Sequence, residues 1–202
     1  MNKGFYYKYF NLTNIYSKLF ENFKNMKKTL ILYFLFATVS FNVLAQTETS
    51  KVKWYTIEEA LKLNEKNPKK IFIDVFTDWC GWCKTMDKNT FSHPVIADYL
   101  NKFYYPVKFN AESKNDITYK GIVYKNKGTE TRSPHELAAA LLNGQLSYPS
   151  VVYMDGDSKL LTAVPGYTTP TDIEPILVFF AEDYYKTTKW EDFKAKFVSK
   201  IK

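Results

Sequence analysis

From about residue 50 onward, short apolar segments alternate with longer amphipathic ones. Residues 71–76 form an apolar run of the length of a buried strand, and residues 103–110 carry apolar side chains at alternate positions. Pro106 favours a place near the edge of a sheet for the second segment, because proline has no N–H for the ladder. Further strands are expected at 149–154 and 160–164, an antiparallel pair, and at 52–55, a short edge strand.

Four segments begin with a threonine or serine that is followed three residues later by glutamate. This spacing is typical of a capping box at the start of a helix. The four predicted caps are Thr56, Ser133, Thr171 and Thr188. Two more helices are expected, one from the turn after residue 80 to about residue 89 and one beginning at Pro94, because proline suits the first helical position.

The alternation of strands and helices predicts an α/β fold with a central mixed sheet flanked by helices. Residues 111–147 are long for one connection, so we expect an insert with its own hairpin between the third and fourth strands. A C-terminal amphipathic helix is expected at 188–202. Its apolar stripe indicates packing on its own domain, and a partner or membrane contact is the alternative.

The positive charge of the chain is concentrated at its N-terminus. The formal net charge is +7, but residues 1–45 contain six lysines and a single acid, which leaves 22 basic and 20 acidic residues in the remainder. A surplus this small gives no polybasic patch, so nucleic acid is not an expected partner.

Residues 26–45 have the order of a secretory signal: a basic start, an apolar run, and small residues before Gln46. Cleavage between Ala45 and Gln46 would release an exported domain of residues 46–202. The alternative is an uncleaved membrane anchor, for which the run is short. Residues 1–25 form an N-terminal extension to which the sequence assigns no role.

The chain contains two cysteines, and they lie in the hexapeptide Trp79-Cys80-Gly81-Trp82-Cys83-Lys84. This motif follows an apolar strand and precedes a predicted helix. Two thiols at this spacing can close a small disulfide ring. The free N–H groups and partial positive charge of a helix N-terminus stabilise a thiolate on the first cysteine. The arrangement therefore indicates redox chemistry.

Two other interpretations of the cysteine pair were weighed. A zinc site would need His93 and His135 as further ligands, but they lie far apart in sequence at helix starts, where they are expected to be caps or surface residues. A purely structural disulfide is disfavoured because a ring this small constrains little of the chain. No metal is therefore expected.

Several motifs together resemble the thioredoxin superfamily, over roughly residues 52–185. Asp74 in Ile73-Asp74-Val75-Phe76 occupies the place of the family's buried acid, and Lys108 that of the lysine near it. Tyr148-Pro149 matches the family's cis-proline, and Gly166 the glycine after the fifth strand. Trp-Cys-x-x-Cys-Lys followed by Phe91-Ser92-x-Pro94-Val95 is most similar to periplasmic thioredoxin-like reductases, including the C-terminal domain of DsbD-type interchange proteins.

The resemblance implies a thioredoxin fold and an exported, periplasmic thiol-disulfide oxidoreductase that reduces protein disulfides without a dissociable cofactor. Cys80, exposed at the helix start, would attack the substrate, and Cys83 would resolve the mixed disulfide. Asp74, its pKa raised by burial and moderated by Lys108, would accept the proton of Cys83. The residues implied to bind substrate are Trp79, Gly81, Trp82, Tyr148, Pro149 and Gly166.

The expected partners are protein disulfide substrates and an upstream thiol electron donor, for which a membrane thiol relay is the candidate. Two features depart from thioredoxin, namely the Gly81-Trp82 dipeptide and the bulky Tyr148. The alternatives are a disulfide oxidase or isomerase and a non-catalytic binding module. Asp74 as a merely salt-bridged core acid and Pro149 as a trans residue in a turn are also left open.

Overall fold

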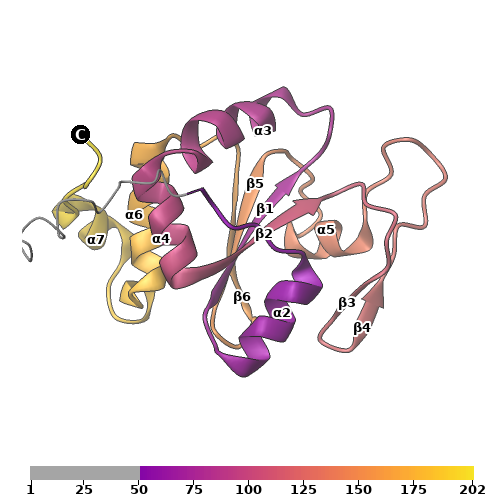
Figure 1. Cartoon of the computed structure of the whole chain (residues 1–202), viewed down its shortest axis with the longest axis horizontal. Helices are drawn as coiled ribbons and strands as arrows, with labels where there is room; N and C mark the ends of the chain where they lie inside the picture. Colours follow the sequence, from indigo (N-terminus) through magenta and orange to yellow (C-terminus); the bar gives the residue numbers. More distant parts are fainter. Residues whose placement is uncertain (1–50) are drawn as a thin grey trace, which may run out of the picture. The chain divides into compact units, whose positions relative to one another are not determined.

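A four-stranded mixed sheet forms the centre of the protein in the computed structural model, which describes residues 51–202 (Figure 1). The strands lie in the order β2 (Tyr104–Asn110), β1 (Lys70–Phe76), β5 (Ser150–Met154) and β6 (Leu160–Pro165). β1 and β2 are parallel, and the other two pairings are antiparallel. The predicted mixed sheet is confirmed. The extension 1–25, the signal 26–45 and the cleavage position after Ala45 lie outside the described residues.

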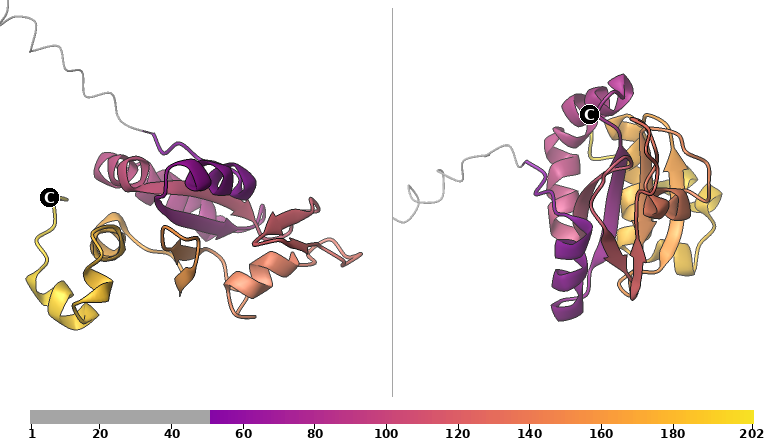
Figure 2. Two further views of the ribbon diagram at one scale, coloured as in Figure 1. Left: turned by 90° about the horizontal axis from the view of Figure 1, so that it is seen from below. Right: turned by 90° about the vertical axis from the view of Figure 1, so that its right-hand side faces the viewer.

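Helices lie on both sides of the sheet (Figure 2). They are α2 (Ile57–Lys66), α3 (Gly81–Met86), which continues as the π-helical turn η1 (Asp87–Phe91), α4 (Pro94–Phe103), α5 (Glu136–Leu141), α6 (Pro170–Ala181), the short 3₁₀ turn η2 (Tyr184–Lys186) and α7 (Trp190–Lys196). The predicted hairpin in the insert is present as β3 (Ile117–Tyr119) and β4 (Ile122–Tyr124).

The core consists of two clusters, one on each face of the sheet, and the side chains of β1 point alternately into one and the other. Ile71, Ile73 and Val75 pack with α2 and α5, whereas Phe72 packs with α4 and α6 on the other face. Successive side chains of a strand point to opposite faces, so Asp74 shares the face of Phe72. The sequence thus places one carboxylate inside the second cluster, which also contains Met86 of α3.

The predicted edge strand at 52–55 is wrong in extent, because only Tyr55 pairs with the sheet. Its N–H donates to Pro106 O at 2.9 Å and its carbonyl accepts from Lys108 N at 3.1 Å, in a parallel bridge to Val107. Continuing this ladder toward Lys53 would require an N–H at position 106, which proline lacks. Pro106 therefore lies on the outer side of β2, at the sheet edge as predicted, and ends the pairing.

The first predicted capping box is confirmed and the second is wrong. Thr56 Oγ1 accepts from Glu59 N, and Glu59 Oε2 accepts from Thr56 N at 2.8 Å. Ser133 does not cap α5. Its hydroxyl donates to Glu130 O, and the side chain of Glu136 accepts the N–H of Lys125 instead. The cap is His135, two residues later.

The third and fourth predicted boxes are also wrong. Thr169, not Thr171, caps α6, and its Oγ1 accepts from Asp172 N at 3.3 Å. Glu174, expected to close the box, is buried and accepts from Lys200 N at 2.9 Å. At α7, Lys189 takes the cap position without a side-chain bond, so Thr188 has no capping role. In the third box, Glu174 bonds to a distant segment instead of to the helix start. In the fourth box, the helix starts one residue later than predicted.

This correction gives a test of the α6 cap. We expect Thr169→Ala to lower the free energy of unfolding by about 1 kcal/mol, because a helix N–H loses its acceptor. Thr171→Ala, its matched control two residues along, should change it by less than about 0.5 kcal/mol. Urea unfolding followed by circular dichroism measures both. A larger loss for Thr171→Ala than for Thr169→Ala would contradict the assignment.

The C-terminal helix packs on its own domain, as predicted, but it is shorter than 188–202. Phe193 of α7 is buried, with its ring 5.2 Å from that of Phe179 and 4.8 Å from that of Tyr184. Trp190 also contacts Phe179. The helix ends at Lys196. Within residues 51–202, none of the helices has the length and apolar character needed to cross a membrane.

Candidate active site

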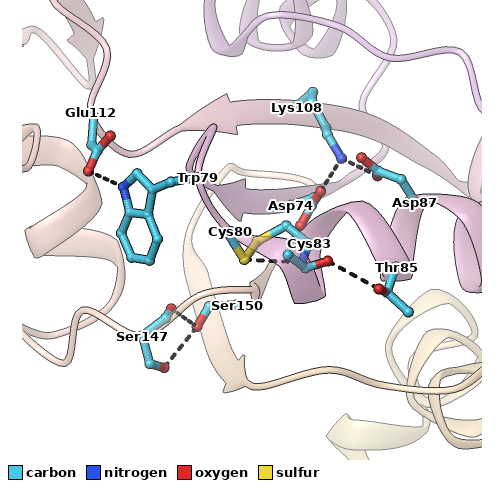
Figure 3. The surroundings of a disulfide bond; sticks show 11 residues. Asp74, Trp79, Cys80, Cys83, Thr85, Asp87, Lys108, Glu112, Ser147 and Ser150 are labelled. Atoms are coloured by element: carbon cyan, nitrogen blue, oxygen red, sulfur yellow. Dashed lines mark hydrogen bonds and ion pairs between the residues drawn. A yellow bond between two sulfur atoms is a disulfide. The ribbon is translucent and has the colours of Figure 1, made fainter. Parts of the chain in front are cut away.

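A disulfide joins Cys80 and Cys83 at the start of α3 (Figure 3). Cys80 is the N-cap residue of this helix, and its Sγ accepts the N–H of Cys83 at 3.0 Å. The Cα atoms are 5.3 Å apart. Because a helix N-terminus offers unpaired N–H groups and partial positive charge, a thiolate formed at Cys80 is stabilised where it stands.

The expectation that Cys80 is exposed is wrong for this oxidised state. Only 4% of Cys80 and 2% of Cys83 is accessible to solvent. The sulfur of Cys80 lies against the first turn of α3, where it is bonded to the sulfur of Cys83. The exposed surface here belongs instead to Trp79 and Trp82, which are 50% and 63% exposed.

Asp74 lies beneath this helix, paired with Lys108. The parallel register of β1 and β2 sets the two residues directly opposite each other, and Lys108 Nζ lies 2.5 Å from Asp74 Oδ2. Asp74 is 1% exposed, and its Oδ1 has no hydrogen-bond partner among the described residues. Burial raises the pKa of Asp74 from 3.8 to about 6, although Lys108 opposes the rise.

Lys108 is shared between two carboxylates. Its ammonium group also contacts Asp87 of the π turn that continues α3, and it lies 5.0 Å from the ring centres of both Trp54 and Phe76. Sequence analysis missed Asp87. An acid one turn after the second cysteine was the available signal, but its contact depends on how the π turn approaches β2. The negative charge of Asp87 disfavours ionisation of Asp74 and so contributes, less than burial does, to the raised pKa of Asp74.

Four aromatic side chains beside the disulfide, those of Trp79, Trp82, Tyr148 and Tyr167, form what we call the rim. The ring of Trp79 meets that of Tyr148 edge to face at 6.2 Å, and the ring of Trp82 lies 5.4 Å from that of Tyr167. Gly81 lies between the two tryptophans, and a side chain built there would meet nothing within 4 Å. The space beside Gly81 is therefore open to another molecule.

The peptide bond between Tyr148 and Pro149 is cis, as expected from the resemblance. Gly166 adopts a φ of +93°, which favours glycine, and its N–H donates to Pro149 O at 2.7 Å. Tyr148 is thereby brought to the rim, where its ring contacts Trp79. Gly166 supports the cis-proline from the neighbouring strand.

The insert reaches the same rim, which the sequence did not indicate. Trp79 Nε1 donates to Glu112 Oε1 at 2.8 Å, and the guanidinium carbon of Arg132 lies 4.8 Å from the centre of the Trp79 ring (Figure 3 shows the Glu112 bond). Trp79 is thus held by the insert on its indole N–H and on one ring face. The arginine had a sequence signal, since it is the single arginine among 28 basic residues.

The two histidines do not join the cysteines. His135 is fully buried as the cap of α5, where its Nδ1 accepts from Leu137 N and its Nε2 lies 3.0 Å from Asn115 O. Both ring nitrogens are thus occupied. His93 takes the cap position of α4. Among residues 51–202, no cluster of three histidine, cysteine or acidic side chains has the arrangement of a metal site.

The sequence matches a family and several known proteins. Residues 35–177 match Thioredox_DsbH, described as a protein of unknown function, DUF255. The thiol:disulfide interchange protein DsbD of Pectobacterium atrosepticum is 32% identical over 82 residues, which are 38% of this chain and 14% of that protein. An uncharacterised Caenorhabditis elegans protein, B0495.5, is 30% identical over 88 residues, which are 42% of this chain and 12% of that protein.

The chain thus spans only a small part of the length of these two curated relatives. Among solved structures, one described as DsbH oxidoreductase has a TM-score of 0.49 and 19% sequence identity, covering 69% of this chain and 92% of that one. A putative disulphide-isomerase from Bacteroides thetaiotaomicron has a TM-score of 0.44 and 24% identity, over 64% of this chain and 93% of that one.

Proposed function

The chain belongs to the Thioredox_DsbH family, and from this premise we propose that it is an exported thiol-disulfide oxidoreductase that reduces protein disulfides. The observation that carries the proposal is the Cys80–Cys83 disulfide at the start of a helix, with the buried carboxylate of Asp74 beneath it. The interchange activity that the name of DsbD states for the relative is of the same class.

In the first step, the reduced protein attacks its substrate. The Cys80 thiolate attacks one sulfur of the substrate disulfide, a new S–S bond forms to Cys80, and the other substrate sulfur leaves as a thiolate that takes a proton. Cys80 is suited to this role because it occupies the N-cap position and its Sγ already accepts a helix N–H. The positive end of the helix lowers the pKa of such a thiol.

In the second step, the Cys83 thiolate attacks Cys80 Sγ. The mixed disulfide breaks, the Cys80–Cys83 bond forms, and the second substrate sulfur is released as a thiol. Two electrons have then passed from the protein to the substrate. Cys83 is buried, so its proton needs an acceptor inside the protein. Asp74 is the candidate, since Oδ1 is unpartnered and its pKa of about 6 suits proton transfer near neutral pH.

The substrate would lie along the rim. Trp79 and Trp82 provide exposed apolar surface for a loosely folded chain, and the space beside Gly81, the residue after Cys80, is open. We assign the backbone of Tyr148, ahead of the cis-proline, to pairing with the substrate strand, in the manner of added β-strands.

Export rests on the sequence of residues 26–45, and it determines what partner the cycle needs. In an oxidising compartment the disulfide formed in each turnover must be reduced again by a two-electron thiol donor, and a membrane thiol relay is the candidate. The chemistry uses no dissociable cofactor. If the electrons ran in the opposite direction, the same residues would form disulfides in exported proteins.

Two assays test the proposal. The reduced protein is expected to accelerate insulin reduction by dithiothreitol, with Cys80→Ser as the inactive control that retains the fold. Equilibrium titration with glutathione or dithiothreitol, read by the fluorescence of Trp79 and Trp82, should then give a potential near the ~−270 mV of thioredoxin. A potential near the ~−120 mV of strong oxidants would reverse the direction. No reversible transition at all would leave a binding module.

A further inference from the structure

Arg132 contacts Trp79, one of the aromatic residues beside the disulfide. It is the single arginine in the chain, and its guanidinium lies over the face of Trp79, the residue that precedes Cys80. Lysine and arginine differ most where a planar cation must stack on an aromatic ring and still present hydrogen-bond donors along its edge. Position 132 is such a place.

The insert holds this arginine near the rim through its own hydrogen bonds. Asn126 Nδ2 donates to Glu112 O at 3.1 Å and to Ser133 O at 2.7 Å. The amide therefore ties together the two short segments that contact Trp79, one through Glu112 and one through Arg132. Ser133 is fixed further, because its N–H donates to Glu130 O. The contact between Arg132 and Trp79 is thus part of an ordered frame.

No carboxylate among residues 51–202 neutralises the guanidinium of Arg132. Among residues 51–202 it takes part in no ion pair and no hydrogen bond, and it is exposed. Glu112, the carboxylate on the same tryptophan, uses Oε1 to accept the indole N–H. Stacking leaves the edge of a guanidinium free, and its fork of N–H groups matches a carboxylate.

We propose that Arg132, stacked on Trp79, selects disulfide substrates that carry a carboxylate next to the cysteine attacked by Cys80. This rests on the proposed function, since it assigns the specificity of that same site. The substrate class is an acidic peptide segment around a cystine. The carboxylate would meet the edge of the guanidinium while the substrate sulfur approaches Cys80. Among residues 51–202, Glu112 is the one carboxylate that hydrogen-bonds to the same indole, so it would compete weakly for the cation.

The test uses two cyclic peptide disulfides that differ only beside one cysteine. One has glutamate on both sides of that cysteine, and the other has glutamine. Protein that has been reduced and freed of reductant is mixed with each peptide, and the single-turnover rate is followed by tryptophan fluorescence at low ionic strength. We expect about a three- to fivefold preference for the acidic peptide, the size of an exposed ion pair, and less at high salt.

Variants separate charge recognition from support of Trp79. Arg132→Gln should bring the preference close to one while changing the rate with the neutral peptide by less than about twofold. Arg132→Lys should retain less than half of the preference, because lysine lacks the stacked fork. Glu112→Gln keeps an acceptor for the indole and should raise the preference. Lys66→Gln, which removes one positive charge from the exposed last residue of α2, before the start of β1, is the matched control and should leave the preference unchanged.

The outcomes are distinguishable. Equal rates for the two peptides with the wild-type protein would overturn the inference and leave the proposed function intact. An equal loss of single-turnover rate with both peptides in Arg132→Gln would also overturn the inference, since Arg132 would then only position Trp79. If the wild-type protein reduced neither peptide, the proposed function would fail and the inference with it.

Discussion

The Cys83→Ser protein is expected to remain covalently attached to its substrate and to lose turnover in the insulin assay. Cys80 can still attack, because it keeps its N-cap position on α3. Serine at position 83 cannot displace the substrate sulfur, so the mixed disulfide persists. Non-reducing electrophoresis and mass spectrometry should show an adduct of protein plus substrate that dithiothreitol releases.

The matched control is Cys80→Ser. Both sulfurs are buried in the oxidised state, but Cys83 lacks the N-cap position at which a thiolate is stabilised, so no adduct should form. The two variants distinguish the attacking cysteine from the resolving one. Cys80 lies at the N-cap of α3, and Cys83 lies one turn inside the helix. An adduct with Cys80→Ser and none with Cys83→Ser would reverse the two roles.

The second large effect is a gain in stability when Asp74 becomes asparagine. Burial raises the pKa of Asp74 from 3.8 to about 6, so ionising this carboxyl costs more free energy in the folded protein than in the unfolded chain. A rise of this size corresponds to about 3 kcal/mol. The raised pKa contributes full stability below about pH 3.8, and that contribution is lost as the pH rises through about 6. Wild type therefore carries the whole penalty at pH 8.

Asp74→Asn is accordingly expected to raise the free energy of unfolding by about 1 to 3 kcal/mol at pH 8, and by little near pH 4. Urea unfolding of the oxidised protein at both pH values measures the difference. Asp78→Asn is the control, because that exposed acid makes one surface hydrogen bond with Asn110 and should change stability by less than about 0.5 kcal/mol. A loss of stability at pH 8 in Asp74→Asn would contradict the origin assigned to the raised pKa.

The same variant should slow the release of product. If Asp74 accepts the proton of Cys83, the asparagine protein should form the mixed disulfide normally and resolve it more slowly at neutral pH, by about 10²-fold, the usual contribution of a general base. The opposite signs of the two effects, higher stability with slower resolution, distinguish a functional carboxyl from the core acid that sequence analysis had left open as an alternative.

The sequence by itself determined the local parts of this site. A strand, a turn with two cysteines and a helix follow from neighbouring residues, and so does the Thr56 cap, whereas the cis-proline was implied by the family resemblance alone. The resemblance also implied that Lys108 lies near Asp74, and the parallel register of β1 and β2 sets the two residues opposite each other. Each of these depends on contacts within one element or between two paired strands.

Tertiary structure decided the rest, because those features depend on where distant segments meet. Glu112 reaches Trp79 across 33 residues, and Arg132 reaches it from farther along the same insert. The glutamates of two predicted capping boxes accept hydrogen bonds from other segments instead, one from Lys125 N and one from Lys200 N. The burial of Cys80 in the disulfide-bonded state is a further feature of this kind. Residue patterns show which groups can interact, and packing determines which partner each of them takes.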